Sequence, residues 1–177
     1  MNIFANIQVK KFDKAKKLFD VYNKTFKLSS DDYSNGGLIY SKLHLNDRAL
    51  ILYNKSLKIN PKNIYSLNNK GFTLTVLEKY LEAIPLFDEA IKLNTTFAYS
   101  YNNRGLSKIK TGKVAEGLID IKKSINLDPE NSYSYRNLGI YHFDIGEIEK
   151  ARQLFLKAKE LDVDTYNIDE LIMSTEK

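Results

Sequence analysis

Cysteine is absent from this chain of 177 residues, which excludes disulfide bonds, thiolate metal sites and cysteine nucleophiles. Long apolar runs are absent as well, and no stretch approaches the ~20 residues that a helix needs to span a bilayer. The segment 1–15 has no apolar stretch long enough for a secretory signal. We therefore expect a cytoplasmic protein that does not cross a membrane.

Patterns typical of catalysis and metal binding are also missing. The chain has two histidines, His44 and His142, and neither belongs to a metal-ligand spacing or a nucleophile motif. His44 falls in a predicted turn, where histidine tolerates a positive φ, and His142 falls at a core position of a predicted helix. We predict structural roles for both histidines, no cofactor, no metal and no enzymatic activity.

The net charge of +5 is unevenly distributed. Residues 1–29 hold seven lysines and two aspartates, whereas residues 30–177 hold 20 basic and 20 acidic side chains. A basic protein often binds nucleic acid, but here the basic character is local. We expect the lysines of the first segment to solvate and cap a terminal helix, with an acidic protein or RNA as the functional alternative. These lysines are Lys10, Lys11, Lys14, Lys16 and Lys17.

What the chain does contain is a repeat of 34 residues. A glycine, a small residue and a large apolar residue each recur at this interval. The three series are Gly37, Gly71, Gly105 and Gly139; Ala15, Ala49, Ala83, Gly117 and Ala151; and Phe19, Tyr53, Phe87, Ile121 and Phe155. A fixed period indicates a stack of similar supersecondary units, which offers a concave binding surface and usually no chemistry.

Each unit is predicted to be a helix, a turn and a second helix. In the unit 98–131, apolar residues spaced by four around Gly105 mark the first helix. Gly112 suits the turn, and Pro129 ends the second helix. A glycine inside a helix costs up to ~1 kcal/mol relative to alanine. Its regular return therefore predicts that the second helix approaches the first closely at this position.

This pattern resembles the tetratricopeptide repeat, which has an early aromatic, a glycine, a mid-repeat alanine, a late aromatic and a terminal proline. The matching residues of one unit are Tyr33, Gly37, Tyr40, Ala49, Tyr53 and Pro61. The resemblance covers 30–165 and implies an all-α fold, a right-handed α-solenoid of stacked antiparallel helix pairs. It predicts eleven helices at most and no strand.

The period also divides the chain, which we expect to form one continuous domain over 1–177. The predicted parts are a degenerate N-terminal repeat at 1–29, repeats at 30–63, 64–97, 98–131 and 132–165, and a capping helix at 166–177. Lys70, Arg104 and Lys108 stand where the family prefers apolar residues. Their first helices are therefore expected to be less tightly buried.

In stacks of this family the first helices line the concave face, so the resemblance implies a groove for a peptide or protein surface. The residues expected to line it are Tyr65, Asn68, Asn69 and Phe72; Tyr99, Asn102, Asn103 and Leu106; and Tyr133, Arg136, Asn137 and Ile140. An amide side chain can donate to and accept from a peptide backbone at once. As an alternative, the asparagines serve helix starts or a neighbouring unit, and the tyrosines pack against the next unit.

The predicted function is that of a protein–protein interaction module or adaptor. A clamp for the carboxylate tail of chaperones is disfavoured, because only Arg136 supplies a cation along the relevant row. The partner could be a chaperone, a secretion component or a toxin that the protein neutralises. The alternative function is an RNA-binding helical repeat that uses the basic N-terminal helix, which a steep salt dependence of binding would favour.

Overall fold

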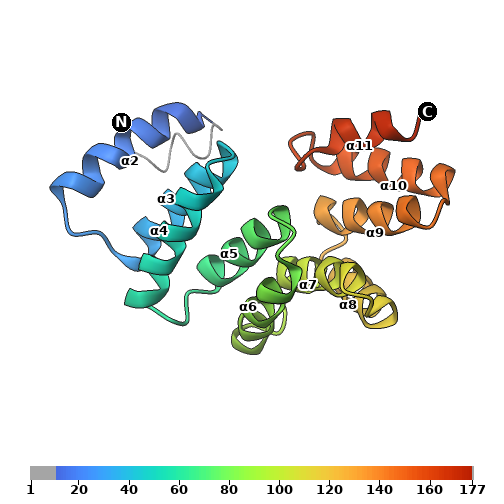
Figure 1. The fold of residues 1–177 in the computed structure, drawn as a ribbon, viewed down its shortest axis with the longest axis horizontal. Helices are drawn as coiled ribbons and strands as arrows, with labels where there is room; N and C mark the ends of the chain where they lie inside the picture. Colours follow the sequence, from blue (N-terminus) through green and yellow to red (C-terminus); the bar gives the residue numbers. More distant parts are fainter. Residues whose placement is uncertain (1–10, 177) are drawn as a thin grey trace. The chain divides into compact units, whose positions relative to one another are not determined.

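The computed structural model describes residues 11–176, and this range contains ten helices and no strand. Figure 1 shows the helices in chain order. They are α2 (Phe12–Thr25), α3 (Ser30–Lys42), α4 (Asn46–Ile59), α5 (Ile64–Val76), α6 (Tyr80–Leu93), α7 (Ala98–Lys110), α8 (Val114–Leu127), α9 (Ser132–Asp144), α10 (Ile148–Leu161) and α11 (Ile168–Ser174). For the described residues, the prediction of an all-helical fold is confirmed.

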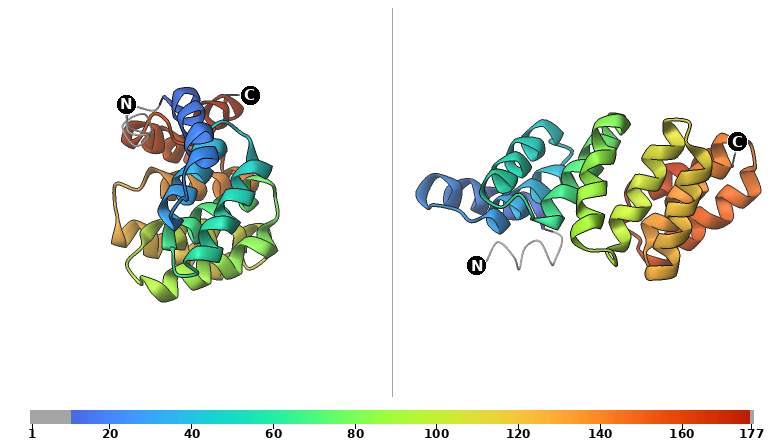
Figure 2. Two further views of the ribbon diagram at one scale, coloured as in Figure 1. Left: turned by 90° about the vertical axis from the view of Figure 1, so that its left-hand side faces the viewer. Right: turned by 90° about the horizontal axis from the view of Figure 1, so that it is seen from below.

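The helices form pairs that follow the predicted repeats. Within the described range, each of the four repeats over 30–165 holds two helices, from α3 and α4 to α9 and α10. Three of these pairs, α3 with α4, α7 with α8 and α9 with α10, lie side by side and run in opposite directions, as the two further views in Figure 2 also show. No helix among residues 11–176 is long and apolar enough to cross a membrane.

The chain divides into two compact units, Met1–Leu77 and Glu78–Lys177. The N-terminal unit contains α2 to α5 and the C-terminal unit contains α6 to α11. The border therefore falls inside the predicted repeat 64–97, between its two helices. That the whole chain forms one continuous domain stays a prediction.

The core of each unit is built from the periodic series. The large residues of the series are all buried, and Phe87, Ile121 and Phe155 have no exposed surface at all. Gly37, Gly105 and Gly139 face them: a Cβ atom on Gly37 would lie 2.4 Å from the Tyr53 ring. Because a real Cβ cannot stand so close to an aromatic carbon, alanine does not fit there without a shift. The predicted close approach of paired helices is thus confirmed.

The turns inside the pairs share a strained backbone geometry. His44, Glu78, Gly112 and Gly146, again 34 residues apart, all have positive φ, at 58°, 59°, 88° and 80°. The predicted turn position of His44 is confirmed. Glu78 occupies the same position, although nothing in its residue type indicates it. For an L-residue with a side chain this conformation costs about 1–2 kcal/mol.

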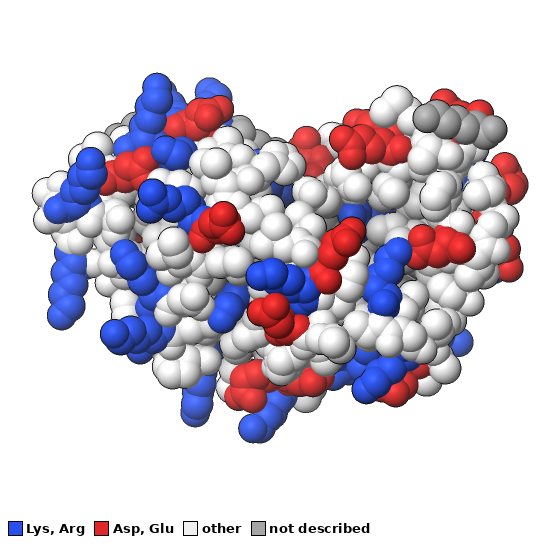
Figure 3. All heavy atoms as spheres, viewed as in Figure 1, with Lys and Arg blue, Asp and Glu red and all other residues white. Residues whose placement is uncertain are grey.

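The two units carry charge of opposite sign. Residues 1–77 contain 13 lysines and arginines and five acidic residues, whereas residues 78–177 contain 14 basic and 17 acidic residues. Figure 3 shows basic side chains gathered over α2 to α4, and acidic side chains gathered over α10 and α11. Residues 30–177 taken together are neutral, so the acidic excess becomes visible only when the chain is divided between Leu77 and Glu78.

Candidate functional site

The twelve residues predicted to line the groove lie on three first helices. Four of them belong to α5 in the N-terminal unit, and the other eight belong to α7 and α9 in the C-terminal unit. Helices α7 and α9 contact each other. The structure therefore brings together the eight residues on α7 and α9, and the α5 residues form a separate set.

On α5 the accessible member of the set is Tyr65, which is 60% exposed. Phe72 and Asn69 are half-buried, and Asn68 is buried. The Asn68 amide donates a hydrogen bond to Oδ1 of Asn69 at 3.1 Å. The two amides thus support each other, and the tyrosine ring projects from the surface of the helix.

On α7 and α9 the asparagines form a buried amide network. Asn102 has no exposed surface and Asn137 is 1% exposed. Nδ2 of Asn137 donates to Oδ1 of Asn102, and Nδ2 of Asn102 donates to Oδ1 of Asn103 at 3.2 Å. In this structure the amides link the first helices of neighbouring repeats, which is the alternative that the sequence left open. Whether they also contact a ligand stays a prediction.

Two tyrosines flank this network. Tyr99 on α7 is 42% exposed, and Tyr133 on α9 is half-buried. Partial burial, together with Asp128 and Tyr133, raises the pKa of the Tyr99 hydroxyl, so this ring stays a neutral donor near neutral pH. On the same helices, Leu106 of the predicted groove is buried and Ile140 is half-buried. Tyr99 is therefore the most accessible of these four side chains.

Arg136 on α9 is a buried cation that no described carboxylate neutralises. It is 6% exposed, and its guanidinium donates to the Tyr166 carbonyl at 2.8 Å, to Oδ1 of Asn167 at 2.7 Å and to Oδ1 of Asn137 at 2.6 Å. Its guanidinium carbon also lies 5.4 Å from the centre of the Tyr166 ring. Burial lowers the pKa of Arg136 to about 10, which leaves the side chain positively charged at neutral pH.

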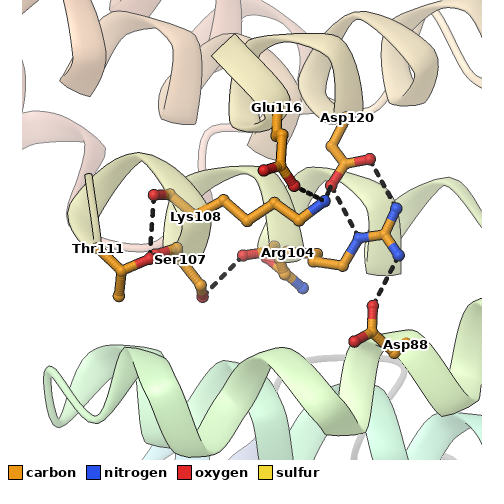
Figure 4. Close-up of polar contacts among 8 residues, drawn as sticks. Asp88, Arg104, Ser107, Lys108, Thr111, Glu116 and Asp120 are labelled. Carbon is orange, nitrogen blue, oxygen red and sulfur yellow. Dashed lines mark hydrogen bonds and ion pairs between the residues drawn. The ribbon is translucent and has the colours of Figure 1, made fainter. Parts of the chain in front are cut away.

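A second cation of the same unit has the opposite surroundings. Arg104 on α7 makes two hydrogen bonds to Asp120 on α8, at 2.8 and 2.7 Å, and one to Asp88 on α6 at 2.7 Å. Lys108 joins the cluster at 3.0 Å from Asp120 and 3.4 Å from Glu116. Figure 4 shows the carboxylates converging on the two cations from the flanking helices.

This cluster overturns one expectation from the sequence. Arg104 and Lys108 were expected to leave their helix less tightly buried, yet the side chains of both are only 16% exposed. Burial acts to lower the pKa of Arg104, but the hydrogen bonds to Asp120 and Asp88 outweigh it, so the pKa lies above its usual value. Asp120 stands at the position where other repeats have leucine, and that exchange was the signal that the sequence analysis missed.

A further ion pair joins the C-terminal ends of the two first helices. Nζ of Lys110 on α7 lies 2.5 Å from Oδ2 of Asp144 on α9. The two residues are 34 positions apart, so the pair repeats the period of the chain. It holds the C-terminal ends of α7 and α9 together.

The predicted lysine cluster lies on α2 and just before it. Lys10 lies outside the described residues. Lys11, Lys14 and Lys17 are exposed, whereas Lys16 forms an ion pair with Asp20 at 2.9 Å. Exposed lysines on one helix suit both predicted roles, a solvated surface and contact with an anionic partner.

His142 lies where its predicted core position puts it. It is buried on α9, and its Nδ1 atom lies 2.8 Å from Oε2 of Glu147 at the start of α10. Lys150 and, to a smaller extent, His142 lower the pKa of the exposed Glu147 carboxyl. Such a contact spans the turn between the two helices of one pair and is consistent with the structural role predicted for this histidine.

Solved structures similar to this chain contain the same kind of repeat. A thermophilic TPR protein of Thermus thermophilus superposes with a TM-score of 0.79 at 16% identity, over 98% of this chain and 95% of that chain. MamA from Desulfovibrio magneticus RS-1 gives 0.69 at 20% identity, over 93% of each chain. YrrB, described as a TPR protein with an unusual peptide-binding site, gives 0.63 at 20% identity, over 98% of this chain and 88% of that chain.

At these identities the likeness shows the fold alone, and none of the curated protein sequences matches this chain. Two family models do match it, and both describe the tetratricopeptide repeat. One matches residues 52–84 and 121–153, and the other matches residues 33–63 and 98–131. Together they cover more than half of the chain, so the protein belongs to the tetratricopeptide repeat family, whose members are non-catalytic scaffolds for protein interactions.

Proposed function

We propose that this protein is an adaptor that binds a peptide or protein surface along its first helices, with Tyr99, Tyr133 and Arg136 as the main contacts in the C-terminal unit. In the N-terminal unit, Tyr65 supplies a separate contact of its own. The observation that carries the proposal is Arg136, a buried cation without a carboxylate partner among residues 11–176, beside tyrosines. The cytoplasmic location stays a prediction.

The surroundings of Arg136 favour a ligand with an acidic group. Each terminal nitrogen of a guanidinium carries two N–H groups, and each of those of Arg136 donates one bond among the described residues. A buried charge without a counter-charge is unfavourable. A ligand carboxylate would supply both the missing charge and acceptors for the remaining N–H groups. Binding would therefore relieve an unfavourable feature of the free protein.

The tyrosines suit the rest of such a ligand. A tyrosine ring offers a large apolar area with few rotatable bonds, and its hydroxyl can donate or accept. Tyr99 and Tyr133 stand on neighbouring helices that the Asn102–Asn137 bond and the Lys110–Asp144 pair hold together. In this proposal the buried asparagines position the helices, and the tyrosines contact the ligand. Asn69 and Phe72 beside Tyr65 are the further contacts on α5.

A relative supports a peptide as the ligand class. YrrB, which shares the fold at 20% identity, is described as having a peptide-binding site. The candidate sources of the peptide are a chaperone, a secretion component and a toxin that the protein neutralises. The acidic group inferred from Arg136 narrows the choice to a segment with at least one carboxylate.

Capture of binding proteins from the source cell tests the proposal. We expect proteins retained by the wild type to be lost by the double variant Tyr99→Ala/Tyr133→Ala, with affinity lowered at least about tenfold, or ~1.4 kcal/mol. The matched control is Ile119→Ala, which removes an exposed apolar side chain from α8 in the same unit. The control should retain every partner. Equal retention by the tyrosine variant would refute the tyrosine contacts.

The same experiment separates the RNA alternative. If the partner is RNA bound by the basic helix, Lys11→Gln/Lys14→Gln/Lys17→Gln should abolish retention, and ribonuclease treatment should release the bound material. On the groove proposal, both treatments leave retention unchanged, because the lysines lie on α2 or just before it and the proposed contacts lie on α5, α7 and α9.

A further inference from the structure

The outward surface of α2 departs from the repeat pattern at three positions. Tyr22 stands where the other second helices have a small residue without exposed surface, yet Tyr22 is 45% exposed. Those small residues are Ser56, Ala90, Ser124 and Ala158. Val21 and Phe26 are 60% and 58% exposed. At the position of Val21 the other repeats have charged residues, and at that of Phe26 they have asparagine or aspartate.

These apolar residues form a patch among lysines. The rings of Tyr22 and Phe26 are 5.1 Å apart. Lys14, Lys17 and Lys24 are exposed, and none of them forms an ion pair with another described residue. We call Lys14, Lys17, Val21, Tyr22, Lys24 and Phe26 the α2 surface. Exposed aromatic and aliphatic side chains surrounded by charges of one sign are typical of an interaction surface.

The C-terminal unit carries a surface of complementary character. Residues 160–176 contain six acidic residues and no lysine or arginine. Within this segment Val163 and Met173 are exposed apolar residues, at 66% and 56%. Asp164, Asp169 and Glu170 of the same segment are exposed, and Asp169 lies 2.8 Å from Nζ of Lys159. We call Val163, Asp164, Asp169, Glu170 and Met173 the α11 surface.

The two surfaces match in both charge and polarity. Each combines exposed apolar residues with exposed charges, which are lysines on the α2 surface and carboxylates on the α11 surface, and Figure 3 shows the corresponding basic and acidic areas. We propose that the α2 surface of one copy docks on the α11 surface of a second copy. This contact joins two different patches and is therefore heterologous, so each bound copy keeps one surface for a further copy.

Self-association should depend on protein concentration and on salt. By sedimentation velocity, the weight-average mass of the wild type should rise from that of one chain to at least twice that value between micromolar and high-micromolar concentration. Added salt should reduce it, because exposed charges are screened. A wild-type protein that stays monomeric at every concentration in low salt would overturn the proposal.

Charge reversal provides the decisive comparison. Lys14→Glu/Lys17→Glu/Lys24→Glu changes the α2 surface, and Asp169→Lys/Glu170→Lys changes the α11 surface. Each variant alone should remain monomeric, since its two surfaces then carry the same sign. An equimolar mixture should associate, because one variant keeps the native α11 surface and the other keeps the native α2 surface. Failure of the mixture to associate, with both variants folded by circular dichroism, contradicts the proposal.

Two control experiments test whether the association is specific to the two surfaces. The triple variant Lys113→Glu/Lys122→Glu/Lys123→Glu makes the same charge change at exposed positions before and on α8, and it should associate like the wild type. If the α11 variant unfolds, an excess of the α2 variant added to wild type should shorten the assemblies, since it binds through one surface only. Loss of association in the α8 variant, or unshortened assemblies, would show that specific docking is absent. Co-purification of nucleic acid with the α2 surface would assign that surface to RNA instead.

Discussion

At the scale of single residues, Gly117 separates helix propensity from packing. The same position holds alanine in the other repeats, and alanine is the better helix former by about 1 kcal/mol. In the structure, however, a Cβ atom on Gly117 would lie 2.5 Å from the carbonyl oxygen of Gly105 and 2.6 Å from a side-chain carbon of Ile109. Two facing glycines thus let α7 and α8 approach more closely than helices with an alanine at this contact.

We predict that Gly117→Ala destabilises the protein by about 1–3 kcal/mol, because a backbone oxygen cannot move aside cheaply. Urea denaturation measures the change in the free energy of unfolding. The exposed Lys122→Ala on the same helix should stay within about 0.5 kcal/mol of the wild type. If Gly117→Ala instead stabilises the protein, helix propensity outweighs packing, and the close approach of α7 and α8 at Gly117 is contradicted.

A second prediction concerns the strained turn residue Glu78. Its φ of 59° suits glycine, which occupies the same position at 112 and 146. Glu78→Gly should stabilise the protein by about 1 kcal/mol through relief of this strain. Glu82→Gly on helix α6, an exposed glutamate with helical backbone, should destabilise it by about 1 kcal/mol. Thermal melting of the two variants should therefore shift in opposite directions.

A third prediction addresses the buried amides. Asn137→Ala removes the donor to Asn102 and an acceptor from Arg136, both inside the C-terminal unit. Groups left buried without a partner cost about 1–3 kcal/mol each, so the free energy of unfolding should fall by about 2–3 kcal/mol. An unchanged melting temperature would mean that this amide serves a ligand and not the stack.

At the scale of helices, the charge cluster replaces apolar contacts between α6, α7 and α8. Asp120 is the shared acceptor for Arg104 and Lys108. Its removal would leave two mostly buried cations with only the exposed carboxylates of Asp88 and Glu116. A buried ion pair is not in itself very stabilising, whereas breaking one is costly.

We therefore predict that Asp120→Ala destabilises the protein by about 3 kcal/mol. The triple variant Arg104→Leu/Lys108→Leu/Asp120→Leu introduces leucine, which other repeats have at each of these positions. The free energy of unfolding of this variant should lie within about 1 kcal/mol of the wild-type value. If the triple variant is as unstable as Asp120→Ala in guanidinium denaturation, the cluster does more than replace apolar packing.

At the scale of the whole molecule, stability should be distributed unevenly along the chain. In a repeat protein each repeat contacts only its neighbours, and here the helices form two compact units. Phe155 on α10 packs with Ala151, Ala158 and Ile168 in a cluster inside the C-terminal unit. A mutation in this cluster should therefore destabilise only the helices that contact it.

We predict that Phe155→Ala lowers the free energy of unfolding by about 3–5 kcal/mol. Hydrogen exchange should show which helices lose protection. Amides of α10 and α11 should lose protection, whereas amides of α3 and α4 in the N-terminal unit should keep theirs. The neighbouring Leu156→Ala, which removes a half-exposed side chain, should leave all protection near the wild-type level. Equal loss of protection along the whole chain would show one cooperative unit.

Much of this fold follows from the sequence by itself. A 34-residue period in glycine, alanine and aromatic positions determines paired helices, the burial of residues such as Phe87 and the turn at His44. The physical reason is that these features depend on local geometry: helix period, the size of a side chain and the φ that a turn needs. Each can be inferred from residues close together in the chain.

The tertiary structure decided the features that depend on partners far apart in sequence. An asparagine has the same donors and acceptors whether it faces a ligand or a neighbouring helix, so only the fold shows that Asn102 and Asn137 bond to each other. Likewise, the burial of Arg104 depends on Asp120, and the unneutralised charge of Arg136 depends on the absence of a nearby described carboxylate. Burial and charge pairing are properties of the surroundings of a residue, and its type alone does not determine them.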